Sequence, residues 1–117
     1  VRLSEEVGAF CLAEGVEKTK AQWAAIATEE MAVNVSKYGY NKDKLKSIDV
    51  RVRINQDNYL TLCFRDDGVP FDPTVYSEAE KDTFRSSGIG LIRALAQSVE
   101  YSYVLGFNVT VITLDVG

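Results

Sequence analysis

Hydrophobic residues recur at helical spacing over the first third of the chain. A first helix is predicted from about Leu3 to Ala13, and Gly15 follows as a typical C-terminal stop. One face of that helix carries Val7, Phe10 and Cys11. A second helix is predicted from about Glu17 to Tyr38, where Gly39 and a polar NKDK turn end the pattern. Its apolar stripe is expected to comprise Trp23, Ile26, Ala27, Met31 and Tyr38.

The hydrophobic period changes to two between Ile48 and Asp66. The first alternating run places its apolar residues at Ile48, Val50, Val52 and Ile54. A QDN turn leads into a second run, YLTLCFRD, so we predict a hairpin with one buried face. The inward positions of the second strand are Leu60, Leu62 and Phe64. Asp66 continues their phase, so a carboxylate is expected to point toward the core at the end of this strand.

The rest of the chain predicts a loop, a helix and two strands. Glycine and proline interrupt regular structure in DGVPFDPTVYSEAEKDTFRSSG, which indicates a long loop with room for a short helical turn. Helical spacing returns in GIGLIRALAQS, and VEYSYV and NVTVITLDV predict strands joined by a turn at Leu105 to Phe107. This order indicates an α+β sandwich with helices on one face of a largely antiparallel sheet.

Length and charge narrow the class of protein. We expect one domain over residues 1–117, as a fragment of a longer protein because the chain begins at Val1 rather than Met. The 13 basic and 17 acidic residues give a net charge of −4 and are interleaved, which argues against a nucleic-acid or anionic-membrane surface. No apolar run approaches the ~20 residues that span a membrane.

Cysteine and histidine content excludes several kinds of site. Cys11 and Cys63 occur in apolar contexts without a CxxC motif, so both are expected to be reduced core residues. The chain contains no histidine. It therefore cannot supply a Ser-His-Asp triad, a histidine metal ligand or a phosphoacceptor histidine of its own.

A polar pair interrupts the stripe of the second helix. Glu30 and Asn34 lie one turn apart and project into the apolar stripe. Two interpretations are open. Both side chains are hydrogen-bonded to water or backbone at the rim of the helix, as most buried polar groups are hydrogen-bonded, or both face a polar ligand. In the second, a carboxylate beside an amide oxygen suits general-base chemistry next to Mg²⁺, which takes few protein ligands.

Two glycine-containing segments also have two interpretations each. RDDGVPFDP is either a turn that ends a strand, or a place where Asp66 accepts a hydrogen bond from a buried amino group while Gly68 lets a ligand approach the backbone. RSSGIGL is either a serine-capped helix start, or a start whose free N–H groups hold phosphates.

Together, these segments resemble the GHKL (Bergerat-fold) ATPase superfamily, and specifically its bacterial anti-sigma-factor serine/threonine kinase branch. EEMAVNVSKYGY is similar to the N box, DDGVPFDP to the first glycine box, SSGIGLIRALAQSVEYSY to the second, and NVTVITL to the last strand. The resemblance extends from Leu3 to Val116. It implies a two-layer α/β sandwich with helices on one face of a mixed, mostly antiparallel sheet.

For the phosphate end of an ATP site, the resemblance implies that Glu30 is the general base and Asn34 the Mg²⁺ ligand. It places Lys37 near the phosphates and gives Arg85 the role of stabilising the transferring phosphoryl group. The same end is shaped by Gly88 and Gly90.

For the adenine end, the resemblance implies that Asp66 accepts a hydrogen bond from the amino group, with Gly68 beside the ring. Thr110 shares its phase with Ile112 and Leu114, so its side chain is expected on the core face of the sheet. The resemblance gives it a water-mediated contact to the base.

The function that the resemblance implies is an ATP- and Mg²⁺-dependent kinase acting on a serine or threonine of a small antagonist protein. When bound to its alternative partner, such a kinase sequesters a sigma factor. The resemblance also implies a homodimer in the cytoplasm. One alternative is the ATP-binding domain of a histidine kinase, and another is a nucleotide-sensing module without phosphotransfer. The presence of Glu30 argues against the last, because a pure binder needs no base.

Overall fold

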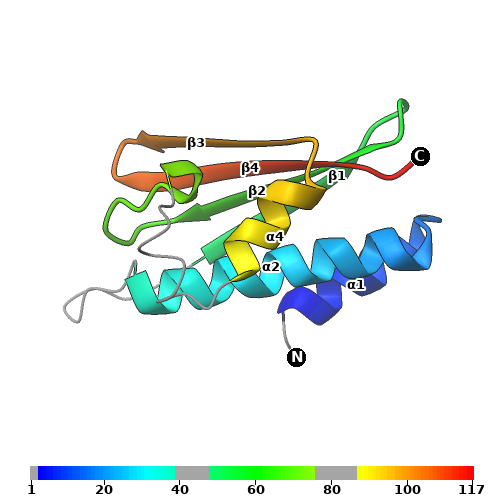
Figure 1. Ribbon diagram of the computed structural model, residues 1–117, viewed down its shortest axis with the longest axis horizontal. Coiled ribbons are helices and arrows are strands. Elements are labelled where there is room, and N and C mark those ends of the chain that lie inside the picture. The colour runs from blue at the N-terminus through cyan, green and yellow to red at the C-terminus, as the bar shows by residue number, and fades with distance from the viewer. Residues whose placement is uncertain (1–2, 39–47, 76–86) are drawn as a thin grey trace.

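Helices form one layer of the computed structural model and an antiparallel sheet forms the other (Figure 1). The structure describes residues 3–38, 48–75 and 87–117. Its elements are α1 (Leu3–Ala13), α2 (Lys18–Tyr38), β1 (Ile48–Ile54), β2 (Tyr59–Asp66), the 3-10 helix η1 (Pro73–Val75), α4 (Ser87–Leu95), β3 (Ser98–Val104) and β4 (Phe107–Asp115). The strand order is β1-β2-β4-β3, and each pairing within the described ranges is antiparallel. The predicted α+β sandwich is confirmed.

The core lies between the inward face of the sheet and the helices. Strand alternation buries every second residue of β2 and β4, because successive side chains point to opposite faces. The sheet contributes Leu60, Leu62, Phe64, Ile112 and Leu114, and the helices contribute Val7, Cys11, Ala21, Ala24, Ala27, Met31 and Ile92. Each large apolar side chain buried in this way stabilises the fold by about 1.5–3 kcal/mol.

Helix α1 ends in a Schellman turn that returns the chain to the core. The N–H of Val16 donates to the carbonyl of Cys11 at 3.0 Å, and the N–H of Gly15 donates to the carbonyl of Leu12 at 3.1 Å. Gly15 has φ 91°, a conformation that side chains disfavour. The turn buries Val16 beside Cys11 and starts α2 antiparallel to α1.

Helix α2 runs for 21 residues beneath the sheet (Figure 1). It packs closely on α1, where a Cβ at Gly8 would lie 3.5 Å from Cβ of Ala25. Ser4 Oγ also donates to Glu29 Oε1 at 2.9 Å. No helix in the described ranges is both long enough and apolar enough to cross a membrane.

The buried face of α2 differs from the predicted stripe. Ile26, expected to be buried, is 40% exposed, whereas Ala24 and Thr28 are fully buried. The face is rotated because small residues let the helix approach its neighbours closely, and because the Thr28 hydroxyl donates to the Ala24 carbonyl at 2.9 Å. On α1, Phe10 is likewise exposed rather than buried.

Cys63 also departs from the prediction. It lies in β2 between the inward residues Leu62 and Phe64, so alternation turns it to the sheet face opposite the helices. It is partly exposed there, whereas Cys11 is fully buried and burial raises the pKa of its thiol.

A two-residue turn joins β3 to β4. Leu105 and Gly106 both have positive φ, at 52° and 85°, as in a type I′ hairpin turn. Leucine is poorly suited to this conformation, and its side chain is 92% exposed. The turn therefore carries backbone strain without compensating burial.

We predict that Leu105→Asn stabilises the fold by about 1 kcal/mol, because asparagine adopts the left-handed conformation more readily. Leu105→Ala is the matched control, since it removes the same exposed apolar surface without favouring positive φ. Urea unfolding monitored by circular dichroism measures both. Equal gains in the two variants would attribute the effect to the lost leucine and not to the backbone.

Candidate nucleotide-binding site

Three polar side chains are buried on the inward face where the end of β2 pairs with the first half of β4. Asp66, Asn108 and Thr110 are 6%, 4% and 2% exposed. Asp66 lies opposite Asn108 in the β2–β4 register, and Thr110 lies opposite Phe64. The sequence predictions that Asp66 and Thr110 face the core side are confirmed. Groups this deeply buried need hydrogen-bond partners in place of water.

The Asp66 carboxylate uses one oxygen within the protein. Its Oδ1 accepts from the N–H of Gly68 at 2.9 Å and from Asn108 Nδ2 at 3.0 Å. Its Oδ2 receives no hydrogen bond from the residues that the structure describes, and neither does the Thr110 hydroxyl. Two acceptors on adjacent strands are therefore left for a polar ligand or for water.

The chain after Asp66 is fixed to β4. The N–H of Phe71 donates to Asn108 Oδ1 at 3.0 Å, and Asn108 Nδ2 donates to the carbonyl of Val69 at 3.0 Å. Asp72 then starts η1, accepting from the N–H and the hydroxyl of Thr74 at 2.8 and 2.6 Å. Gly68, predicted to lie beside a ligand, is buried in this loop.

Tyr101 completes the cluster from β3. Its hydroxyl donates to Asn108 Oδ1. Burial raises the pKa of Tyr101 above its ordinary value, and the nearby carboxylates of Asp72 and Asp66 add to the rise, partly opposed by the N–H of Phe71. The phenol therefore stays protonated and remains a donor over the physiological range.

Neither Asn108 nor Tyr101 was predicted from the sequence to belong to the site. A signal for Asn108 was available, because it shares the inward phase of Thr110, Ile112 and Leu114 in β4. An amide at an inward strand position predicts a buried polar contact.

The general-base candidate lies on α2, which contacts β2 and α4. Glu30 is partly exposed at the margin of the buried face that Ala27 and Met31 form, not in its middle as predicted. Asn34 and Lys37 belong to the same helix, one and two turns further on, and their side chains lie outside the described part of the structure.

The predicted phosphate end corresponds to the start of α4. Gly88 and Gly90 lie in its first turn, and Figure 1 shows this turn next to α2, which it contacts. A Cβ at Gly90 would meet nothing within 4 Å, so the space beside it is open. The first N–H groups of a helix favour anions. Arg85 lies outside the described residues.

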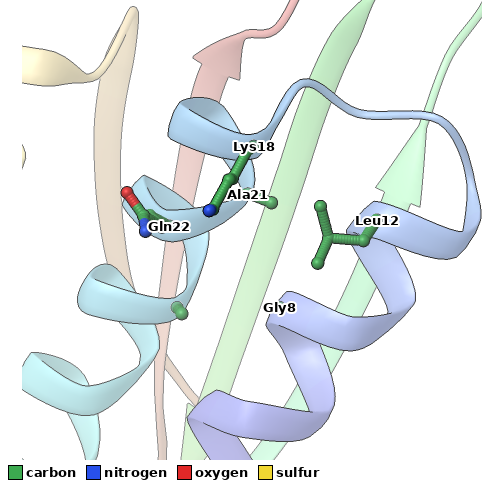
Figure 2. Close-up of a pocket in the computed structure, with 6 residues that line it drawn as sticks. Gly8, Leu12, Lys18, Ala21 and Gln22 are labelled. Carbon is green, nitrogen blue, oxygen red and sulfur yellow. The ribbon is translucent and has the colours of Figure 1, made fainter.

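Two cavities lined by described residues lie away from these groups. One has a volume of about 140 Å³ between α1 and α2, where Figure 2 shows Leu12 of α1 pointing toward α2. The other, of about 240 Å³, opens on the sheet face opposite the helices and is lined by Asp49, Arg51, Cys63 and Arg65. Neither includes Asp66, Thr110 or Glu30, so the candidate site is distinct from both.

No group of three or more His, Cys, Asp or Glu side chains gathers in the described ranges. A Mg²⁺ ion held by Asn34 would not need such a group, because Mg²⁺ takes few protein ligands and keeps water and phosphate oxygens for the rest. The donor type at Asn34, an amide oxygen, fits a hard cation.

Comparisons with solved structures give the same fold. The histidine kinase domain from Erythrobacter litoralis EL346 blue-light activated histidine kinase matches with a TM-score of 0.60 at 15% identity, covering 82% of this chain and 47% of that one. A structure of Erythrobacter litoralis EL346 blue-light activated histidine kinase matches with a TM-score of 0.64 at 15% identity, covering 86% and 32%. The chain thus spans less than half the length of either structure.

The sequence itself matches a family described as a histidine kinase-like ATPase domain over residues 1–114. A search of curated proteins finds no match. The family match covers nearly the whole chain, and the fold agrees with the GHKL ATPases that the sequence resembles. The chain therefore belongs to the histidine kinase-like ATPase domain family.

Proposed function

We propose that this domain binds ATP with its adenine at Asp66 and transfers the γ-phosphoryl group to a protein side chain. The observation that carries the proposal is the buried Oδ2 of Asp66, which receives no hydrogen bond from the described residues while Oδ1 is fixed twice. A carboxylate oxygen in this state requires a donor, and the 6-amino group of adenine is one.

The adenine end distinguishes a purine that donates a hydrogen bond at position 6 from one that accepts there. Asp66 Oδ2 only accepts, so it favours a 6-amino group over a 6-oxo group. Thr110, opposite Phe64 in the register, adds a hydroxyl that reaches the base through water. Gly68 has no side chain, so no Cβ stands between the backbone beside the carboxylate and the ring.

At the phosphate end, residues of this chain position the phosphates and the acceptor hydroxyl and stabilise the charge on them. Glu30 accepts the proton of the acceptor hydroxyl, and Asn34 holds Mg²⁺, which neutralises charge on the phosphates when bound. Lys37 contacts the phosphates, and the first turn of α4 with Gly88 and Gly90 holds them through backbone N–H groups. Arg85 stabilises the transferring group.

The acceptor that we propose is a serine or threonine of a small antagonist protein, with a sigma factor as the alternative partner. The domain acts as a homodimer in the cytoplasm. This choice is supported by the DDGVPFDP motif, which is similar to that of anti-sigma-factor kinases. The fold similarity to a blue-light activated histidine kinase favours a second candidate, in which the acceptor is a histidine on another segment or chain.

Asp66→Asn is predicted to weaken Mg·ATP binding by about 10- to 100-fold, the value of a hydrogen bond to a charged group. The amide oxygen can still accept from Gly68 and Asn108, so an NH₂ donor replaces Oδ2 and opposes the adenine amino group. Mg·ITP, whose 6-oxo group accepts, should be weakened less. Calorimetry measures both, with exposed Asp57→Asn as the control. Equal loss of both nucleotides would contradict base reading by Asp66.

Glu30→Gln is predicted to leave Mg·ATP binding within about threefold and to slow phosphoryl transfer by about 100-fold or more, as expected for loss of a general base. Glu29→Gln is the matched control, since it removes the same charge one residue away and its amide oxygen can still accept from Ser4. Labelled γ-phosphate measures turnover. Unchanged turnover in Glu30→Gln, or ATP binding without turnover in wild type, would favour a nucleotide-sensing module.

The acceptor type is predicted from the stability of the product. Incubation with γ-labelled ATP and an extract of the source cells should label a protein whose phosphate survives acid treatment, as serine and threonine esters do. The Glu30→Gln variant controls for other kinases in the extract. A label that is lost in acid but survives alkali would instead identify histidine as the acceptor.

A further inference from the structure

A single amide connects Asp66 to the loop that follows it. Asn108 Nδ2 lies 3.0 Å from Asp66 Oδ1, 3.0 Å from the Val69 carbonyl and 3.4 Å from the Gly68 carbonyl. On the other side, Asn108 Oδ1 accepts from the N–H of Phe71 at 3.0 Å and from the hydroxyl of Tyr101. Both ends of the amide are therefore occupied.

The orientation of this amide is determined by its partners. Only acceptors face Nδ2, namely a carboxylate and two carbonyls, and only donors face Oδ1. A rotation of 180° would set donors against donors and acceptors against acceptors, which is costly in a group that is 4% exposed. Tyr101 contributes one of the two donors that fix the orientation.

The orientation of Asn108 in turn sets that of the Asp66 carboxylate. The donors from Asn108 and Gly68 converge on the same oxygen, Oδ1. This leaves Oδ2 as the oxygen available to a ligand and prevents exchange of the two oxygens by rotation about χ2. The carbonyls of Gly68 and Val69 are held by the same Nδ2 group, so the loop backbone and the carboxylate move as one unit.

We propose that Asn108, aligned by Tyr101, is a positioning residue for adenine recognition: it holds the Asp66 carboxylate and the backbone from Gly68 to Phe71 in the geometry that binds the base. This inference rests on the proposed adenine site at Asp66. A residue that only stabilised the loop would affect all nucleotides equally. A positioning residue affects the preference for ATP over ITP.

Asn108→Asp tests the proposal with an isosteric change. It keeps an acceptor for Phe71 and Tyr101 but removes the Nδ2 donor and sets a carboxylate about 3 Å from Asp66. At pH 8 the two like charges repel, so we expect Mg·ATP affinity to fall at least 10-fold and the ATP-over-ITP preference to approach one. Lowering the pH favours a proton shared between two carboxylates this close, which supplies a donor, so we expect the ATP-over-ITP preference of the variant to be higher at pH 5.5 than at pH 8.

Calorimetry with Mg·ATP and Mg·ITP at both pH values gives the measurement, and circular dichroism confirms the fold. Wild type at each pH is the reference, because it contains the neighbouring titratable groups Asp67, Asp72 and Tyr101 unchanged. If Asn108→Asp does not fold, Tyr101→Phe tests the positioning role instead, because it removes one donor to Asn108 Oδ1. We expect it to reduce the preference for ATP over ITP about 3- to 10-fold. Exposed Tyr103→Phe on the same strand is its control.

A folded Asn108→Asp variant that binds ATP with wild-type affinity and preference at pH 8 would overturn this inference alone. An equal loss of affinity for ATP and ITP at pH 8 that is not reversed at pH 5.5 would also overturn it. Failure of wild type to bind ATP would instead overturn the proposed function, and this inference with it.

Discussion

Asp66 brings a charged carboxylate to the inward face of the sheet, and a buried carboxylate is costly unless hydrogen bonds replace the water it has lost. The fold meets part of this cost at Oδ1, through the N–H of Gly68 and the amide of Asn108. The other oxygen, Oδ2, receives no hydrogen bond from the described residues, and we propose that a ligand supplies one. The loop after β2, the placement of Asn108 in β4 and the contribution of Tyr101 all follow from the need to hold this one group in a defined orientation.

In the proposed nucleotide site, the sheet and the helices contribute different groups. The sheet supplies rigid inward positions, since Asp66 and Thr110 lie on strands that pair along their full length. In the function that we propose, the helices supply the phosphate end, and the elements that carry Glu30 and the first turn of α4 are in contact with each other. A site built on packed elements holds its groups more closely than one built on loops alone.

Much of this arrangement could be predicted from sequence because strand period two is an unambiguous signal. It placed Asp66 and Thr110 inward, and the Gly15 stop gave the end of α1 correctly. The predicted stripe of α2 was correct at Ala27 and Met31, which are buried, but wrong at Ile26, which is exposed. A hydrophobic scale ranks alanine and threonine below isoleucine, so it does not show that Ala24 and Thr28 are buried by close packing. The bond between Asn108 and Asp66 could not be predicted, because it depends on the β2–β4 register and joins residues 42 positions apart.

The central claim is that Asp66 Oδ2 reads the adenine amino group. A crystal structure of the domain with Mg²⁺ and a non-hydrolysable ATP analogue tests it most directly. We predict the 6-amino nitrogen about 3 Å from Oδ2, with Oδ1 still hydrogen-bonded to Gly68 and Asn108. Adenine bound elsewhere, or bound with Asp66 turned away from the base, would contradict it.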